Sequence, residues 1–486
     1  MRSLDPRLPV LIGLGAAAAS ASVVDLMTDA VVAAAADAGA PALLDRIDCI
    51  AVPQGSWPLT DPGRTVARRV GSPDARTLLC EIGVSQQEVI NHALAAVAAG
   101  RAETFVVAGA EARAWARDGG IDVDEEAEPP DDMLTRPPDF IAAVEIAAGM
   151  AWPVAQQYAL IENALAAAAQ LPPDRQRDEI AGLWARYNAV AAHNPEAAFP
   201  QRRDAAEIAT AGPHNRPLAY PYNRWHASQW TVNQASALLI CSAERAQAAG
   251  VPAERWLFPH VALHSSAAVT LTARRHLEEW PAMGVLGRAA ALHVGRPLEE
   301  LPLAEVYSCF PAAVRVQQRE LGLDPAGTPT LTGGMAFSGG PFNHFVLQSL
   351  RVLGGHLRSD PSALGLLTTV SGMLSKPGLA IWSATPPSRG GAALLADMAT
   401  ETTAATSVVP VVDSPPRDAT TATVASFTVT YGGDEGFDPV RTAIVADLPD
   451  GVRTAATCED SDTARLAVTD GLIGRAVSVK DTTFSL

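Results

Sequence analysis

The residues with the clearest potential for chemistry stand where a helix is predicted to begin. Cys80 precedes the run SQQEVINHALAAVAAG, whose apolar spacing predicts a helix ending at Gly100. A cysteine at a helix N-terminus can act as a nucleophile, because the helix dipole lowers the pKa of the thiol. Ser85 and Glu88 have the Ser-x-x-Glu spacing of a capping box. We therefore expect Ser85 to cap this helix rather than to act as a nucleophile.

Two later segments add polar groups to a predominantly apolar sequence. Tyr307-Ser308-Cys309-Phe310 ends a strand-like run, so the Tyr307 hydroxyl either donates a hydrogen bond to a ligand or packs with its ring in the core. The glycine-rich run GGMAFSGGPFNHF contains His344, which we place in the first turn of the next helix. Such a histidine is more often structural than catalytic.

A further segment, TTVSGMLSKPGLAIWSA, contains Ser371, Gly372 and Lys376. Apart from Lys480, Lys376 is the only lysine in the chain. A single lysine in a loop is usually a solvated charge, so we expect Lys376 to be exposed.

These segments belong to an α/β pattern that occurs twice. From residue 8 to about 112, strand-like runs such as LPVLIGLG and TFVVAGAEA alternate with Ala-rich helical runs, which predicts a layered unit with a largely parallel sheet. We expect PVLIGLG to be a buried strand ending in a glycine turn rather than part of a signal peptide. The same alternation resumes at about 221, so the fold class is α/β with two similar halves.

The pattern divides the chain into a core and two additions. The core comprises residues 1–112 and 221–385, and the interval 113–220 is a mainly helical insertion that begins with the acidic stretch DVDEEAEPPDDM. Residues 386–416 are rich in Pro, Thr, Ser and Gly, as in a linker. Alternating apolar residues and a turn at Asp450-Gly451 predict that residues 417–486 form a small OB-like β-barrel.

Composition excludes several classes of function. The 53 acidic residues exceed the 36 basic ones and leave a net charge of −17, which disfavours nucleic acid and anionic lipid. The 5 cysteines are scattered singly, so we expect neither disulfides nor a metal site, in keeping with a cytoplasmic protein. No apolar run reaches the roughly 18 residues that a membrane span needs.

The four segments together resemble the motifs of the thiolase superfamily. With its added C-terminal domain, the chain is similar to the type 1 thiolase-like proteins, which are related to the sterol-carrier-type thiolases and acetyl-CoA acetyltransferases. The resemblance covers roughly residues 8 to 385 and implies a five-layered thiolase-like fold. Thiolases are at least dimers, so a homo-oligomer is possible, although a monomer remains open.

The same resemblance implies that the thiolase catalytic groups are missing. Counting back from Gly100 without a gap, the nucleophilic cysteine falls on Gly83, and the second cysteine falls on Gly372. Tyr307 replaces the histidine of a His-Asp-Cys-Phe motif. The triplet Gly339-Gly340-Pro341 replaces Gly-His-Pro, so Gly340 stands where thiolases have an imidazole.

Four side chains are the remaining candidates for chemistry: Cys80, Tyr307, Cys309 and His344. Cys80 lies three residues before Gly83, about 4.5 Å away at helical rise, so it is a poor substitute for the nucleophile. The Gly339-Gly340-Pro341 turn would let the backbone approach a ligand closely.

We therefore expect a protein of lipid or sterol metabolism that binds CoA or an acyl-CoA without ordinary thiolase activity. One alternative is an acyl-CoA lyase of the retro-aldol type, with Tyr307 handling the proton and the C-terminal domain acting as an OB-like partner. A second is residual acyltransferase activity. A third is a non-catalytic assembly component whose groove is vestigial.

Overall fold

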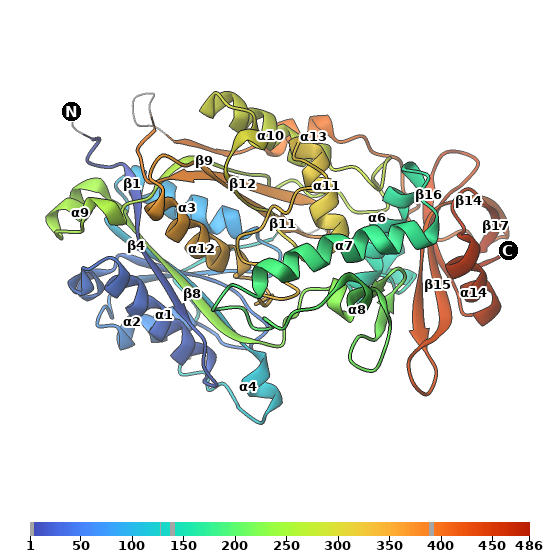
Figure 1. The fold of residues 1–486 in the computed structure, drawn as a ribbon, viewed down its shortest axis with the longest axis horizontal. Coiled ribbons are helices and arrows are strands. Elements are labelled where there is room, and N and C mark those ends of the chain that lie inside the picture. The colour runs from blue at the N-terminus through green and yellow to red at the C-terminus, as the bar shows by residue number, and fades with distance from the viewer. Residues whose placement is uncertain (1–3, 127, 137–140, 388–392) are drawn as a thin grey trace.

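The computed structural model describes residues 4–126, 128–136, 141–387 and 393–486 (Figure 1). Two sheets pack with helices between and outside them, and a third sheet lies at one end of the molecule. The predicted α/β class is confirmed.

The first sheet has the order β1-β8-β4-β2-β3-β5. Strands β4, β2, β3 and β5 are parallel, whereas β8 runs antiparallel between β1 and β4. The largely parallel sheet predicted for the first half therefore holds, with one strand supplied from beyond the insertion. The strand bounds are β1 Pro9–Ala17, β2 Cys49–Pro53, β3 Arg76–Cys80, β4 Thr104–Ala112, β5 Asp132–Leu134 and β8 Asn233–Ser242.

The prediction of a glycine turn at the end of PVLIGLG was wrong. Strand β1 continues through Gly13 and Gly15 to Ala17. A Cβ at either glycine would overlap the backbone of the helix that follows, at Ala34 or Ala30. The glycines therefore serve close packing of strand against helix rather than chain reversal.

The second sheet has the order β10-β11-β12-β9-β13. Its central strands β11, β12 and β9 pair antiparallel, and its two edge strands pair parallel to their neighbours. The strand bounds are β9 Phe258–His264, β10 Leu303–Glu305, β11 Gly365–Ser371, β12 Lys376–Ser383 and β13 Leu394–Asp397.

Helices α3 (Gln86–Ala98) and α12 (Phe345–Ser359) contact strands of both sheets, so they form the central layer. Helix α1 (Val23–Asp37) covers the outer face of the first sheet, and α10 (Pro281–Val294) contacts the second sheet from its other side. The order is helix, sheet, helix, sheet, helix (Figure 1). The remaining core helices are α2 Pro62–Arg69, α9 Ala243–Ala248 and α11 Pro311–Leu321.

The insertion contains five helices and two short strands among its described residues, and it packs on α11 and on the third sheet. Its long helices α6 and α7 run toward the C-terminal part of the chain (Figure 1). The bounds are α4 Arg113–Arg117, α5 Ala143–Ala147, α6 Ala155–Ala168, α7 Pro173–Ala191 and α8 Ala205–Ala209. Short 3₁₀ turns lie elsewhere, at η1 Pro41–Arg46, η2 Arg224–His226, η3 Ala253–Arg255 and η4 Leu298–Glu300.

The third sheet has the order β15-β16-β18-β17-β14-β6-β7, and β15 also pairs with β14. Five strands of the C-terminal region thus pair in a closed circuit, to which β6 adds the end of the insertion and β7 the start of the second half of the core. Gly451 forms the predicted turn between β15 and β16 with positive φ. The bounds are β6 Pro217–Ala219, β7 Tyr222–Asn223, β14 Thr420–Gly432, β15 Asp438–Asp447, β16 Arg453–Cys458, β17 Ala476–Lys480, β18 Thr483–Ser485 and α14 Ser461–Asp470.

The interval 386–416, expected as a linker, carries regular structure where it is described. Strand β13 pairs with β9 at the edge of the second sheet, and α13 (Ala399–Ala405) contacts α10. Residues 388–392 of this interval lie outside the described residues.

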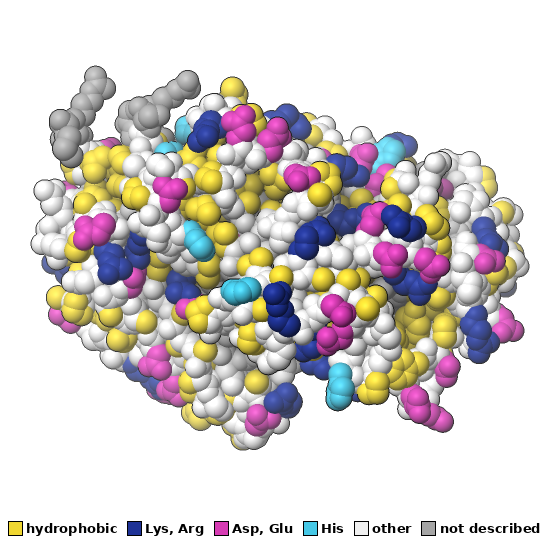
Figure 2. All heavy atoms as spheres, viewed as in Figure 1, with side chains coloured by type: hydrophobic (Ala, Val, Ile, Leu, Met, Phe, Trp, Pro, Cys, Tyr) yellow, Lys and Arg dark blue, Asp and Glu magenta, His cyan; other side chains and the backbone are white. Residues whose placement is uncertain are grey.

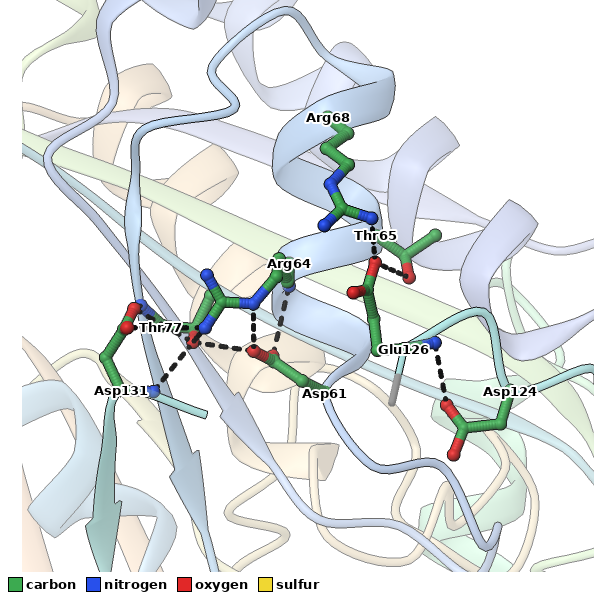
Figure 3. Close-up of polar contacts among 8 residues, drawn as sticks. All are labelled: Asp61, Arg64, Thr65, Arg68, Thr77, Asp124, Glu126 and Asp131. Carbon is green, nitrogen blue, oxygen red and sulfur yellow. Dashed lines mark hydrogen bonds and ion pairs between the residues drawn. The ribbon is translucent and has the colours of Figure 1, made fainter. Parts of the chain in front are cut away.

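The acidic stretch of the insertion is fastened by ion pairs to α2, which packs on the first sheet (Figure 3). Arg64 of α2 contacts Asp61 at 3.1 Å and Asp131 at 3.3 Å, and Arg68 contacts Glu126 at 2.5 Å. Strand β5 then pairs with β3 and covers the edge of the sheet. Acids of this stretch therefore pair with arginines of α2 beside an edge of the first sheet.

On the face shown in Figure 2, acidic and basic side chains are interspersed rather than gathered into one field. All 5 cysteines are free thiols, as predicted. Among the described helices, none combines the length and the apolar character needed to cross a bilayer.

Candidate active site

Gly83 lies immediately before α3, at the position where the sequence placed the missing nucleophile. It is buried and has a φ of +107°, a conformation that strains any other L-residue. A Cβ there would lie 2.9 Å from Cδ of Arg136. The backbone and its neighbours thus leave a side chain at this point strained and short of space.

The prediction that Lys376 is an exposed loop residue was wrong. Lys376 opens strand β12 and is only 1% exposed, and its Nζ donates a hydrogen bond to the Gly83 carbonyl oxygen. Ser371, its partner in the β11–β12 register, donates to the same oxygen at 3.0 Å. Burial lowers the pKa of Lys376 to about 8, against an opposing effect of Glu88. The hairpin therefore delivers an amine to the beginning of α3.

Lys376 faces α3 because of the alternation of β12. Two residues along the strand, Gly378 packs so closely on α3 that a Cβ would lie 2.5 Å from Cβ of Gln87. Residues i and i+2 of a strand share a face, so Lys376 and Gly378 both point toward the helix. Gly372 forms the hairpin turn with a φ of +63°, and none of the 5 cysteines belongs to this hairpin.

Ser85 occupies the N-cap position of α3, but its hydroxyl makes no capping bond, so the predicted capping box does not form. Its carbonyl accepts the first helical hydrogen bonds, from Glu88 and Val89. The Ser85 Oγ is fully buried and has no partner among the described residues. A buried hydroxyl without a hydrogen-bond partner among the described residues therefore lies two residues from Gly83 in the sequence.

Cys80 ends β3 and is fully buried in the hydrophobic core. Burial raises the pKa of its thiol well above the ordinary value. Because the thiolate is the reactive form, the environment of Cys80 is that of an inert, packed cysteine.

Tyr307 and Cys309 are buried at the end of the loop that follows β10. Burial raises the pKa of Tyr307, and burial raises that of Cys309 to about 12. Tyr307 hydrogen-bonds with Gln86 and packs edge-on against Phe345, while Cys309 hydrogen-bonds with Tyr158. Tyr307 therefore remains protonated, with its hydroxyl beside the Gln86 side chain in the first turn of α3.

The glycine-rich loop has no space for an imidazole at Gly340. A Cβ there would overlap Oγ of Ser228, and a Cβ at Gly339 would overlap the side-chain amide of Gln234. Ser228 donates its backbone N–H to the Cys309 carbonyl at 2.9 Å, which fixes it beside the Tyr307 segment. The Gly339-Gly340-Pro341 turn is therefore closed by a serine from another part of the chain.

His344 is the N-cap residue of α12 rather than a member of its first turn. It is 2% exposed, and burial lowers its pKa to about 3, so it is neutral. Its Cβ packs against Gly109, and its Nε2 has no partner among the described residues. His344 is thus a packed, neutral ring.

The structure brings together part of the predicted set. Gly83 precedes α3, Ser371 beside Gly372 donates to the Gly83 carbonyl, and Tyr307 contacts Gln86 in the first turn of α3. Gln86 also accepts a hydrogen bond from the N–H of Val346 at 2.7 Å, so it ties the two central helices together. Sequence reasoning missed Gln86 and Ser228, and its only signal for Lys376 was the scarcity of lysine.

Two cavities are lined by other residues, one of them beside the β11–β12 hairpin at Leu374 and Ser375. One of about 480 Å³ lies between α7, the segment 209–223 and the third sheet, and Tyr220, Tyr431 and Phe437 are among its lining residues. The other, of about 20 Å³, is lined by residues such as Arg274, Trp280 and Ser375. Near it, three potential metal-ligand atoms lie within 4.8 Å of one another, on His276, Glu278 and Glu279.

The sequence matches no family model and no curated protein. Its fold is similar to that of the dimeric peroxisomal thiolase of Saccharomyces cerevisiae, with a TM-score of 0.57 at 13% identity over 78% of this chain and 98% of that one. It is also similar to a structure described as an Ltp2-ChsH2(DUF35) aldolase, with a TM-score of 0.59 at 19% identity over 79% and 99% of the two chains. The chain belongs to the thiolase superfamily.

A more extensive similarity covers the C-terminal region as well. The monomeric SCP2-thiolase like protein type 1 from Mycobacterium smegmatis matches over 99% of both chains, with a TM-score of 0.83 and 28% identity. The solved relatives thus include a monomer and a dimer.

Proposed function

We propose that this protein binds CoA or an acyl-CoA at the thiolase-type site and does not use the thiolase acyl-enzyme route. The proposal rests on the beginning of α3, where Gly83 has no side chain and Lys376 donates to its carbonyl. Cys80 and Cys309 are buried thiols of raised pKa, so neither offers a thiolate there.

Isothermal titration with CoA and several acyl-CoAs at sub-millimolar concentration tests the binding. We expect heat of binding with at least one thioester, together with no thiolysis of acetoacetyl-CoA. Absence of any binding would favour the non-catalytic assembly role, and thiolysis at an ordinary thiolase rate would show that the assignment of Gly83 is mistaken.

The retro-aldol lyase is the second candidate, supported by the aldolase-like fold and by Tyr307. Tyr307 is 7% exposed and stays protonated, so it can donate a hydrogen bond to an oxygen but is a poor base. Any lyase activity of the wild type should fall in Tyr307→Phe. An unchanged rate would remove Tyr307 from the mechanism.

We further propose the following division of the chain. The core comprises residues 1–112 and 221–385, the insertion 113–220, the linker 386–416 and the C-terminal domain 417–486. The closed circuit of β14 to β18 supports an OB-like barrel as the last unit. We also propose an acyl-CoA role in lipid or sterol metabolism, supported by the similarity to thiolases. Growth on a sterol after deletion of the gene would test it.

A further inference from the structure

The larger cavity, of about 480 Å³, lies where the insertion meets the third sheet. Its lining comes from the beginning of α7, the segment 209–223, strand β14, helix α14 and the β14–β15 hairpin. None of its lining residues belongs to the candidate active site. Pockets for small molecules have volumes of about 300–1,000 Å³. The cavity is therefore large enough to hold a whole small molecule at a second site.

Three aromatic rings line this cavity, those of Tyr220, Tyr431 and Phe437. Tyr220 is only 4% exposed, and its ring stacks on Phe427 with the centroids 6.0 Å apart. Burial raises the pKa of both tyrosines, and the Tyr220 phenol adds to the effect on Tyr431, so the two phenols lie close together and stay protonated. Neither hydroxyl forms a hydrogen bond with another residue that the structure describes. Because a polar group buried to this extent normally has a partner, the Tyr220 hydroxyl points to a molecule in the cavity.

The free hydrogen-bonding capacity of the lining is mostly that of acceptors. Arg177 is the one cation among the lining residues, and it already donates to Asp174 at 2.5 Å. Asn223 donates its side-chain amide to the Ala209 carbonyl at 2.8 Å, which leaves its side-chain oxygen for a ligand. Asp178 is exposed and forms no ion pair with a described residue. A ligand that donates hydrogen bonds therefore fits this lining better than one that only accepts them.

The β14–β15 hairpin, which brings Phe437 to the cavity, is acidic. Asp434 and Glu435 precede Phe437 and Asp438 follows it, and all three acids are exposed without an ion pair to a described residue. Figure 2 shows acidic side chains at the tip of this hairpin and apolar side chains between the hairpin and α8. The aromatic lining thus has carboxylates at its edge.

Basic side chains near the cavity are fewer than the acidic ones. Arg465 and Arg475 pair with acids of α14. That leaves Arg175 and Arg216, both exposed and each next in sequence to a lining residue, against Asp178 and the three hairpin acids. The chain as a whole has a net charge of −17. Its field therefore attracts cations to this region.

We propose that this cavity binds a small organic amine in its ammonium form. The ammonium donates hydrogen bonds to Asp178 and to the free tyrosine hydroxyls, and the faces of aromatic rings attract its charge. The hydrocarbon part of the amine contacts Pro217, Pro221 and Val468, which also line the cavity. This second site is independent of the proposed acyl-CoA binding.

Hexamethylenediamine and its diol, hexamethylene glycol, test the proposal, because they share one carbon chain and only the diamine is cationic at neutral pH. Titration calorimetry of the full chain at low ionic strength should give a dissociation constant about tenfold lower for the diamine, as expected for charge-assisted hydrogen bonds. The preference should shrink at about 0.5 M salt, because these charges are near the surface. Equal affinities, or no binding of the diamine, would overturn the inference.

Two substitutions assign the preference to the cavity. Asp178→Asn and Tyr431→Leu should each reduce it about two- to fivefold. Asp74→Asn and Trp152→Leu are the matched controls, since they change an exposed acid and an exposed aromatic residue outside the lining, and both should keep the full preference. Asp178 is exposed, so Asp178→Asn keeps the test decisive even if Tyr431→Leu does not fold.

Two further outcomes would count against the proposal. A preference that survives both cavity substitutions, or that the control substitutions reduce equally, would show that the diamine binds elsewhere. A lysine-containing peptide that binds more tightly than the diamine would assign the ammonium to a partner protein and overturn the small-molecule assignment.

Discussion

Replacing Lys376 by methionine should change how stability depends on pH. Burial moves the pKa of this lysine from 10.5 to about 8. Since a tenfold change in a proton equilibrium corresponds to ~1.4 kcal/mol, holding the ammonium in the folded chain costs about 3 kcal/mol at neutral pH. Lys376→Met removes that cost and loses a hydrogen bond worth about 1 kcal/mol. At pH 7 the variant should therefore be about 2 kcal/mol more stable.

The advantage should vanish as pH rises. The folded wild type releases the Lys376 proton near pH 8, whereas the unfolded chain keeps it until about pH 10.5. Wild-type stability therefore increases over this interval relative to the variant. By pH 10 the wild type should have regained most of the roughly 3 kcal/mol of stability that the buried ammonium costs at neutral pH.

Urea unfolding of wild type and Lys376→Met at pH 7, 8, 9 and 10 measures the difference, because other titrations cancel between the two proteins. Lys480→Met, with an exposed lysine, should show a constant difference from wild type. If the difference for Lys376→Met is also constant across the range, Lys376 titrates as an ordinary lysine and the reasoning fails.

Three further substitutions test the packing of the site and of the insertion. Gly83→Cys should lower stability by about 1–3 kcal/mol because of its positive φ, without producing acetoacetyl-CoA thiolysis; measurable thiolysis would contradict this. Gly340→Ala should cost about 1–3 kcal/mol, and Ser228→Gly in the same chain should restore part of it, as a double-mutant cycle of unfolding would measure. If the two substitutions change the free energy of unfolding additively, the added Cβ at Gly340 does not clash with Ser228. Arg64→Met should speed proteolysis within residues 118–131, whereas Arg117→Met, at an exposed site, should not; equal rates would show that the ion pairs are dispensable.

The strands and helices of the core could be predicted because each carries a local periodic signal. LPVLIGLG and TFVVAGAEA became β1 and β4, and the run after Ser85 became α3 ending before Gly100. The glycines within β1 were misread, because a glycine required by a helix packed on a strand has the same local sequence as a glycine in a turn.

Side-chain environments at the site could not be predicted, because they depend on contacts distant in sequence. Lys376 meets Gly83 only after the β11–β12 hairpin has packed on α3, and Ser228 reaches Gly340 from the segment before β8. Neither contact leaves a periodic pattern. The acidic stretch after α4 was likewise identified by composition, whereas its role depends on arginines of α2.

These long-range contacts bear on how the site could have come to differ from that of a thiolase. If Gly83 and Gly340 were simple losses of catalytic side chains, empty space would remain and restoring a side chain would be tolerated. Instead Arg136 and Lys376 adjoin Gly83, and Ser228 adjoins Gly340. Dense packing makes an added Cβ at either point destabilising. The neighbours and the glycines thus form one consistent arrangement, in which the space beside each glycine is taken by side chains from other parts of the chain.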